Sequence, residues 1–370
     1  VGVTRATGPE RAALGELFAE LCAIESPSGS EGACAERVVA ELASFGVACD
    51  VDASGNLFAC APSADGSREG GVLLCAHLDT VPLTGPVEPV CEDGVWTNRH
   101  EAILGADNKA AVAVILLVAR RLASEPLIPL ELLFTVGEED ALVGAKAFDV
   151  ARLRSRFGYV FDHASPIGEV VIASPHYHRI VAHFHGLAAH AGIRPETGRS
   201  AIAAAARAIA VMPLGRIDHE TTANVGTIRG GAGINVVPER CHVEAEVRSL
   251  DATKADALVT ELLDHLNDGA NAAECDLDVT VEKLFDGYRT KPTAAQVVAA
   301  EAALRACGFT PRQIVTGGGS DANALESAGF PCTNLANGTE RNHQPDERVT
   351  VAALEGMLDV ALALVAEVRP

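Results

Sequence analysis

The sequence lacks what a membrane protein or a nucleic-acid-binding protein needs. Its longest uncharged apolar run, Ala110–Ala119, is about half of the roughly 20 residues that span a bilayer. It has 29 Lys and Arg against 50 Asp and Glu, a net charge of −21, and no basic run that could neutralise phosphates or anionic lipid heads. The first ten residues lack the basic-then-apolar pattern of a secretion signal. We therefore expect a cytoplasmic protein with no membrane or nucleic-acid partner.

The sequence also lacks a disulfide framework, internal repeats and low-complexity tracts. Its ten cysteines are scattered without a C-x-x-C pair, so we expect reduced core thiols. Apolar residues make up 48% and charged residues 21%, as in ordinary globular proteins. A chain of 370 residues exceeds what one core usually serves, which predicts two domains or one domain with a large insertion.

The first part of the chain alternates predicted helices with predicted strands. Apolar residues recur at helical spacing in 14–24, 33–45 and about 109–123. Continuous apolar runs typical of strands buried on both faces occupy 72–76, 130–136 and 158–161, and a shorter β-like run occupies 56–60. Ser28 and Glu31 form a candidate capping box ahead of the second helix. This pattern predicts a three-layer α/β/α domain, in which ligands bind just past the carboxyl ends of the strands.

From about residue 174 the pattern changes to strands with one exposed face. Predicted strands occupy 178–185, 224–229, 242–248 and 277–283, and predicted helices occupy 200–212 and 254–266. This β-α-β-β-α-β order is that of a ferredoxin-like α+β unit. Because the earlier pattern resumes after Pro292, we expect an inserted domain at 174–288 within a discontinuous domain at 1–173 and 289–370.

Four histidines cluster around the first strand of this insert. They are His176, His178, His183 and His185. No acid accompanies them closely in sequence, so we favour a solvated strand face over a metal site there.

Five short segments place imidazole or carboxylate groups at the ends of predicted strands. They are HLDT (77–80), GADNK (105–109), GEED (137–140), FDH (161–163) and RNH (341–343). Such a ligand set, without thiolate, suits a hydrolytic zinc centre with an open position for water. The adjacent acids Glu138 and Glu139 repel each other unless a cation or a shared proton resolves the conflict. One such segment alone is more often a cap or a solvated turn, but the five together predict a metal site.

Four motifs resemble the signatures of the co-catalytic di-zinc exopeptidase and amidohydrolase family. They are HLDTVP (77–82), LGADNKA (104–110), GEE (137–139) and GGGSDAN (317–323). That family includes peptidase T, bacterial glutamate carboxypeptidase, aminoacylase and succinyl-diaminopimelate desuccinylase. The segments DHASPIG (162–168) and AAHAG (188–192) look most like peptidase T and its tripeptidase-like relatives. The resemblance implies a zinc-exopeptidase catalytic domain whose inserted domain is a lid and dimerisation domain.

The resemblance also implies which residues hold the metals. Asp107 would bridge two Zn²⁺ ions. Co²⁺ or Mn²⁺ could occupy the same positions. His77 and Asp162 would complete the coordination of one ion, and Glu139 and His343 would complete the coordination of the other. These residue types fit the chemistry, because a water held between two zinc ions is acidified and can attack an amide carbonyl.

Further positions of the catalytic domain match the family or depart from it. Glu138 matches the general base that takes the proton of the water. Asp79 matches the partner that accepts the free ring N–H of His77. Asn108 stands where the family usually has a second Asp, at a position that is not a ligand there. His163 is a competitor of Asp162 for the metal, and we favour Asp162.

The remaining matches concern the lid and the substrate. His190 matches the lid histidine that reaches the site of a partner subunit and stabilises the tetrahedral oxyanion, which implies a homodimer through the lid. Asn235 and Arg248 match substrate contacts, since an Arg can grip a carboxylate in bidentate fashion; the alternative for Arg248 is an ordinary charged strand residue. The Gly317–Gly319 turn, with Gly318 at its centre, could offer N–H groups to a carboxylate.

The function that these features predict is metal-dependent hydrolysis of short peptides, by an aminopeptidase similar to peptidase T. One alternative within the same fold is a deacylase or desuccinylase of N-acyl amino acids, and another is a glutamate-type carboxypeptidase. A non-catalytic scaffold is disfavoured because every ligand position and Glu138 keep competent residues. A nucleotide-binding interpretation of the Gly317–Gly319 turn fails, because no Lys-Ser/Thr pair follows it.

Overall fold

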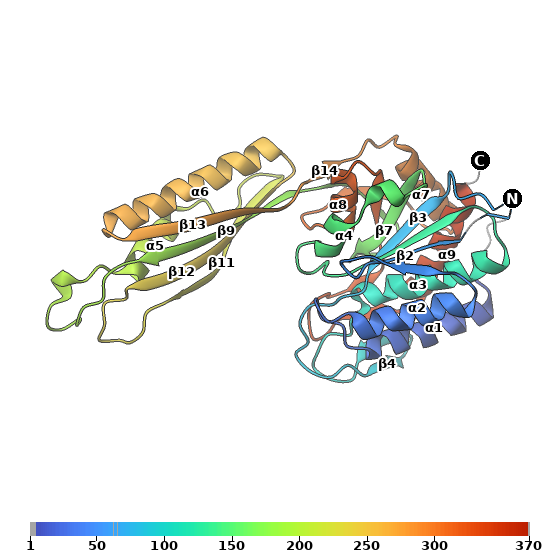
Figure 1. The fold of residues 1–370 in the computed structure, drawn as a ribbon, viewed down its shortest axis with the longest axis horizontal. Coiled ribbons are helices and arrows are strands. Elements are labelled where there is room, and N and C mark those ends of the chain that lie inside the picture. Colours follow the sequence, from blue (N-terminus) through green and yellow to red (C-terminus); the bar gives the residue numbers. More distant parts are fainter. Residues whose placement is uncertain (1–4, 62, 65, 369–370) are drawn as a thin grey trace. The chain divides into compact units, whose positions relative to one another are not determined.

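The structure is a computed structural model that describes residues 5–61, 63, 64 and 66–368 (Figure 1). The described residues form two compact units. The first unit is drawn from Val1–Ile172, Thr290–Val315 and Ser320–Pro370, and the second from Ala173–Arg289 and Thr316–Gly319. Each unit has its own buried hydrophobic core.

A nine-stranded sheet forms the centre of the first unit. Its strands follow the order β1-β2-β6-β3-β7-β16-β8-β14, and β15 pairs with β8. Their bounds are β1 (Cys49–Val51), β2 (Leu57–Ala61), β3 (Val72–His77), β6 (Leu130–Thr135), β7 (Phe157–His163), β8 (Glu169–Ser174), β14 (Tyr288–Arg289), β15 (Arg312–Val315) and β16 (Cys332–Ala336). β3 pairs in parallel with β6 and β7, and β16 pairs in parallel with β7. The carboxyl ends of these four strands therefore meet at one edge of the sheet.

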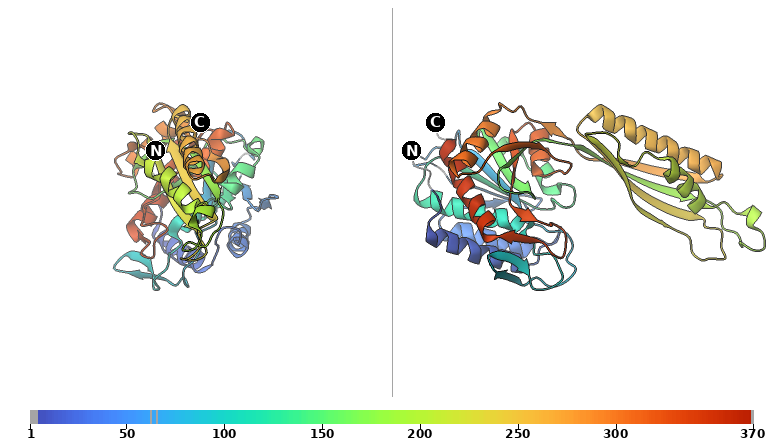
Figure 2. Two further views of the ribbon diagram at one scale, coloured as in Figure 1. Left: turned by 90° about the vertical axis from the view of Figure 1, so that its left-hand side faces the viewer. Right: turned by 180° about the vertical axis from the view of Figure 1, so that it is seen from behind.

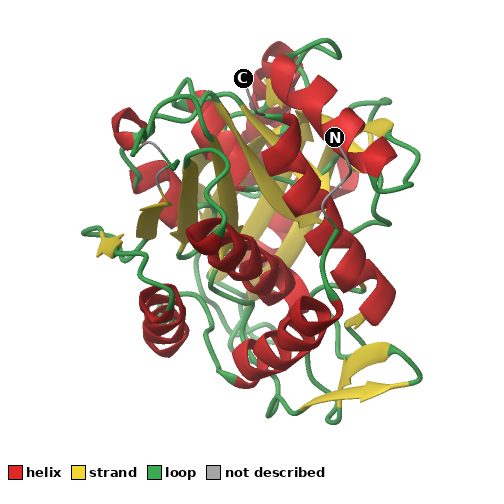
Figure 3. Cartoon of the chain, turned by 90° about the vertical axis from the view of Figure 1, so that its right-hand side faces the viewer, coloured by secondary structure: helices red, strands yellow, loops and turns green. Residues whose placement is uncertain are grey.

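Helices cover both faces of this sheet (Figures 1 and 3). The larger layer contains α1 (Gly8–Ala23), α2 (Gly32–Ser44), α3 (Ala106–Ser124), α7 (Ala295–Ala306) and α9 (Val351–Glu367). α4 (Val143–Ala147) and α8 (Asp321–Ser327) contact each other on the opposite face. Successive strand residues point to opposite faces, so Leu74 packs in the core of the larger layer, whereas the neighbouring Leu73 is buried on the other side. The predicted three-layer α/β/α architecture is confirmed.

α3 accounts for the longest apolar run of the sequence. Ala110–Ala119 is buried along its whole length, because α3 lies between the sheet and the helices α1 and α9. A helix that is covered on all sides is apolar on all sides. No helix within the described residues is long and apolar enough to cross a bilayer.

A second, four-stranded sheet in this unit was not predicted from the sequence. Its order is β17-β18-β5-β4, with the bounds β17 (Thr339–Glu340), β18 (Arg348–Thr350), β5 (Val95–Asn98) and β4 (Pro89–Glu92). Strands of two to four residues, several of them half exposed, leave too short a pattern to detect. The sheet matters for function because β17 and β18 are joined by the segment 341–347, which carries His343.

The second unit is a five-stranded sheet with two helices on one face (Figure 2). The strand order is β10-β11-β12-β9-β13. The elements are β9 (His176–His185), α5 (Ala201–Val211), β10 (Gly215–Arg216), β11 (Thr221–Gly230), β12 (Arg240–Ser249), α6 (Ala252–Ala272) and β13 (Asp276–Phe285). The four long strands pair antiparallel. The predicted ferredoxin-like order is confirmed, with the short β10 added at one edge.

The histidines around β9 do not share one environment. His178 points to the same face as Ile180, toward the helices, and is 7% exposed. His183 lies on the open face and is exposed. The expectation of a solvated face therefore fits His183 and is wrong for His178. Among the described residues, no metal-binding group is found on this strand.

Candidate metal centre

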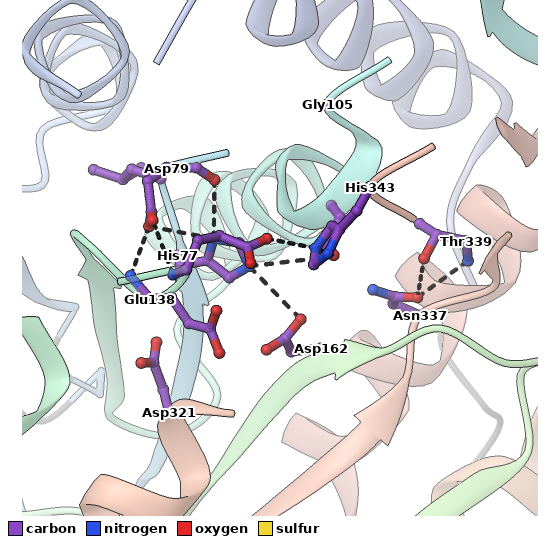
Figure 4. A network of polar contacts seen from close by, with 12 residues as sticks. His77, Asp79, Gly105, Glu138, Asp162, Asp321, Asn337, Thr339 and His343 are labelled. Carbon is purple, nitrogen blue, oxygen red and sulfur yellow. Dashed lines mark hydrogen bonds and ion pairs between the residues drawn. The ribbon is translucent and has the colours of Figure 1, made fainter. Parts of the chain in front are cut away.

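The five predicted metal ligands gather at the carboxyl edge of the parallel strands in the first unit. Figure 4 shows His77, Asp162 and His343 among them. His77 is the last residue of β3, and Asp162 lies at the end of β7. Glu139 lies in the turn after β6, Asp107 lies at the start of α3, and His343 lies between β17 and β18. Five segments that are distant in sequence thus contribute to one site.

His77, Asp107 and Asp162 form one candidate ligand group, called the His77 group below. The Nε2 atom of His77 lies 3.5 Å from Oδ1 of Asp107 and 3.7 Å from Oδ1 of Asp162. The Nδ1 atom of His77 lies 3.0 Å from the backbone oxygen of Asp79 and can donate to it, which leaves the Nε2 lone pair directed at the carboxylates. Separations of 3.5–3.7 Å are too long for hydrogen bonds but suit atoms that each lie about 2.0–2.2 Å from a shared ion.

Asp107, Glu139 and His343 form a second candidate group, called the His343 group below. The Nε2 atom of His343 lies 3.2 Å from Oδ2 of Asp107 and 2.7 Å from Oε1 of Glu139. Asp107 therefore presents one oxygen to each group. A carboxylate in this position can bridge two cations, as the resemblance implied.

The electrostatics of the site favour positive charge. Burial lowers the pKa of His77, but its contacts with the carboxylates of Asp107 and Asp162 outweigh that effect and raise this pKa well above its usual value. Hydrogen bonds to Asp107 and Glu139 raise the pKa of His343 to about 10. Burial, together with the neighbouring Asp162, raises the pKa of Glu138 well above its usual value. Two divalent cations would supply the positive charge that protons otherwise bring to this cluster.

Asp79 supports more of the site than the sequence suggested. Its buried carboxylate accepts hydrogen bonds from the backbone N–H groups of Glu138 (3.0 Å) and Glu139 (3.1 Å) and from the hydroxyl of Ser28 (2.7 Å). The oxygen of Asp79 nearest to the His77 ring is its backbone carbonyl, while the carboxylate lies 3.4 Å from Nδ1. Asp79 therefore fixes the turn that carries the predicted base and one predicted ligand, and it also lies against His77.

The predicted capping box at Ser28 and Glu31 is wrong. α2 begins without a side-chain cap. Ser28 instead donates to Asp79, and Glu31 accepts from the N–H groups of Gly29 (2.9 Å) and Gly137 (3.1 Å). Both residues support the site through contacts with distant segments, which a local motif does not reveal.

A buried carboxyl that the sequence analysis did not single out also faces this site. Asp321, the first residue of α8, accepts a hydrogen bond from the hydroxyl of Thr135. Burial raises its pKa to about 6. Figure 4 shows its carboxyl group pointing toward Glu138.

The two doubtful positions of the catalytic domain lie outside the ligand groups. His163 approaches Glu169 at 3.7 Å and belongs to neither the His77 group nor the His343 group, and burial lowers its pKa. Asn108 is fully buried and is not part of either group. Asp162 rather than His163 is thus the residue that the fold brings to His77.

The four predicted oxyanion and substrate contacts, His190, Asn235, Arg248 and Gly318, all belong to the second unit, although the sequence placed Gly318 in the discontinuous domain. Within it, the backbone of Asn235 accepts from the N–H of Ala191 (2.9 Å), which places Asn235 next to His190. The Nδ1 atom of His190 accepts from the N–H of Gly192 (3.2 Å). In the neutral ring the proton then resides on Nε2, which can donate a hydrogen bond.

Arg248 lies beside the glycine-rich turn. Its guanidinium stacks 4.0 Å from the ring centroid of Tyr177 and donates to the backbone oxygen of Gly317 (3.2 Å). It also pairs with Glu246 at 3.2 Å. The structure thus brings Arg248 and Gly318 together as neighbours and separates them from the pair of His190 and Asn235 along the unit.

Two family descriptions match the chain. "Peptidase dimerisation domain" matches residues 177–274, which lie in the second unit, and "Peptidase family M28" matches residues 56–168, which lie in the first.

Relatives along the whole length agree with these matches. The uncharacterized protein YqjE of Bacillus subtilis is 33% identical to this chain, and the alignment spans 95% of this chain and 97% of YqjE. Among solved structures, the aminopeptidase PepT of Bacillus cereus is 34% identical with a TM-score of 0.86, and a tripeptidase of Staphylococcus aureus is 31% identical with a TM-score of 0.91. Each covers 97% of this chain and 99% of its own. The chain belongs to the peptidase T family of metallopeptidases, metal-dependent enzymes that hydrolyse peptide bonds.

Proposed function

We propose that this chain is an aminopeptidase for short peptides with two zinc ions, held by the His77 group and the His343 group. The observation that carries the proposal is the position of Asp107, which directs one carboxylate oxygen at each group. A set of carboxylate oxygens and imidazole nitrogens suits Zn²⁺, and also Co²⁺ or Mn²⁺. Relatives named aminopeptidase and tripeptidase support the substrate class.

Two ions in these groups would acidify a water molecule and polarise the carbonyl of the scissile bond. Glu138 then takes the proton of the water and passes it to the leaving amine. Burial and the neighbouring Asp162 raise the pKa of this carboxyl group, which favours its protonated form in the absence of the ions. The hydrogen bond from its N–H to Asp79 fixes the turn from which it acts.

The second unit supplies the groups that contact the substrate. His190 donates from Nε2 to the oxyanion that develops on the carbonyl oxygen, since its Nδ1 is already occupied by Gly192. Arg248 and the backbone of Gly318 receive the carboxylate of the peptide, and Asn235 contacts the substrate beside His190. Tyr177 keeps the guanidinium of Arg248 in place by stacking.

The protein acts as a homodimer through the inserted domain, for which we propose the limits 174–288. The match to a peptidase dimerisation domain supports this assembly. So does the outer edge of β11, which pairs with β10 only at Thr222 and Ala223 within the described residues. Ile228 on this edge and Ile202 and Val211 on α5 are exposed apolar side chains that a second copy would cover. A cytoplasmic location stays a prediction of the sequence.

A substrate panel tests the reaction. Purified protein with Zn²⁺ or Co²⁺ should hydrolyse tripeptides with a free N-terminus and release the N-terminal residue, identified by mass. N-acetylated tripeptides and N-acyl amino acids should be turned over far more slowly. Preferred hydrolysis of N-acyl amino acids would identify a deacylase instead, and release of the C-terminal residue would identify a carboxypeptidase.

Variants of three adjacent residues test the roles. Glu138→Gln should bind both ions and turn over about 10²–10⁴-fold more slowly, because it loses the base. Glu139→Gln should bind one ion more weakly, because it loses a ligand. Asp140→Asn is the matched control, since Asp140 is exposed and belongs to neither group. The reverse result for Glu138 and Glu139 would contradict the assignment.

A further inference from the structure

Glu347 is a buried carboxylate that neither the sequence motifs nor the proposed mechanism uses. It is 2% exposed and lies four residues after His343, in the segment between β17 and β18. Its carboxylate accepts three backbone hydrogen bonds. Oε2 accepts from the N–H groups of Leu104 and Gly105, each at 2.8 Å, and Oε1 accepts from the N–H of Asp107 at 2.9 Å.

The turn that Glu347 holds is the one that aims the shared ligand. Asp107 has φ −83° and ψ 104°, outside the helical region, although α3 begins at Ala106. Gly105 before it has a φ of 76°, which favours glycine. N–H groups at the start of a helix have no partners within the helix. Glu347 supplies acceptors for them from a segment about 240 residues away in sequence.

Glu347 also joins the two chain segments that form the His343 group. One segment carries Asp107 and the other carries His343, whose Nε2 atom lies 3.2 Å from Oδ2 of Asp107. His343 is in the left-handed region at φ 64°, and its side chain is 48% exposed. A half-exposed ligand in an irregular loop needs an anchor nearby, and the buried Glu347 is that anchor on the same loop.

We propose that Glu347 is a positioning residue for the metal centre: it fixes the turn of Asp107 against the loop of His343, and so sets the spacing of the ligands in the His343 group. It does not contact the ion or the substrate. A neutral side chain could cap α3, but a carboxylate offers an acceptor oxygen to each side of the turn and forms the stronger, charge-assisted bonds. This inference rests on the proposed two-metal function.

The test compares Glu347→Gln with a matched control. Glutamine has one acceptor oxygen, so at least one N–H of the turn loses its partner. Glu131→Gln is the control: Glu131 is 1% exposed and also accepts backbone N–H groups, those of Arg154 and Ser155, but it lies at the opposite end of its strand from the site. Both variants should lose stability in the presence of a chelator.

Metal binding separates the two variants. In competition titrations with a chromophoric chelator, Glu347→Gln should bind the weaker of two Co²⁺ ions about 10–100-fold less tightly than the wild type. The visible absorption of that second equivalent should also change, because the ligand geometry changes. Glu131→Gln should match the wild type in both measurements. Should Glu347→Gln not fold, Glu347→Asp, which keeps the charge but has a shorter reach, is titrated in its place with the same expectation.

A double variant locates the effect. In a His343→Ala background, Glu347→Gln should add little further loss of affinity, because the His343 group is already broken. Fully additive losses would overturn the proposal, as would affinities within about 3-fold of the wild type for both ions. If the wild type binds two ions and Glu347→Gln binds them with the same affinity, only this inference is refuted. Wild-type protein that binds fewer than two ions refutes the proposed metal centre and this inference with it.

Discussion

Asp79 offers a direct test of how the site is held together. Its carboxylate is fully buried and accepts the backbone N–H groups of Glu138 and Glu139 on different oxygens. Ser28 donates to the same oxygen as Glu139. Asparagine has the same shape but only one acceptor oxygen. In Asp79→Asn, one of the two backbone N–H groups therefore faces an amide NH₂ group and loses its acceptor.

The size of the effect follows from these contacts. A buried donor without an acceptor costs about 1–3 kcal/mol, and a bond to a neutral oxygen is about 1 kcal/mol weaker than a bond to a charged one. Removing one negative charge also reduces the repulsion among the neighbouring carboxylates, which offsets part of this loss of stability. We expect the free energy of unfolding of the metal-free protein to fall by about 2–4 kcal/mol. Metal affinity should fall about 10–100-fold, because the turn that carries Glu139 is released.

Urea unfolding in the presence of a chelator measures the stability. Trp96 is the only tryptophan of the chain, lies on β5 in the first unit, and packs against Phe18 with ring centroids 5.6 Å apart. Its fluorescence therefore reports the unfolding of the unit that contains the site. Competition titrations measure the metal affinity. Glu131→Gln serves again as the control that loses stability and keeps its ions.

Two results would refute this reasoning. If Asp79→Asn unfolds within about 0.5 kcal/mol of the wild type, its hydrogen bonds do not stabilise the turn. If it is less stable but binds both ions with wild-type affinity, the turn after β6 does not determine how the ligands are placed.

Three further predictions concern the ions and the lid. Asp107→Ala should lose both ions together, because both groups share this residue; two tightly held ions by elemental analysis would contradict the bridge. His190→Ala should lower kcat and keep both ions, and mixing it with Glu138→Gln should recover activity if His190 acts in the partner subunit; no recovery in verified mixed dimers would contradict that role. Because the pKa of His343 is about 10 without an ion, binding between pH 6 and 8 must displace a proton, so apparent affinity should rise with pH, about tenfold per unit for each proton displaced; affinities that do not change across this range would contradict it.

The sequence predicts the layers of the fold and the groups that meet at the edge of the sheet. Strands such as β3 and β6 are largely apolar and buried on both faces. Their apolar runs therefore indicate where each strand lies and which polar residue follows its end. Since parallel strands end at one edge, His77 and Asp162 could be expected to meet. The prediction works where a local pattern and a fold-level rule agree.

The supporting contacts could not be predicted, because they join distant segments through backbone groups. Glu347 accepts N–H groups about 240 residues away, and Glu31 accepts the N–H of Gly137 about 106 residues away. Any residue except proline offers such an N–H, so the sequence does not indicate which residue donates the hydrogen bond. Ser28 and Glu31 also match a capping motif by spacing, and only their tertiary partners show that the motif is not formed.

The unequal burial of the ligands implies that the two ions would exchange at different rates. His77 is 1% exposed and Asp162 9%, and both belong to central strands, so the main sheet holds these ligands of their ion in place. His343 is 48% exposed and lies in a surface loop, which can open without disturbing the core. A chelator would then remove the ions in two kinetic phases and in a fixed order. The protein would lose its activity in the fast phase while the core around α3 still retained one ion.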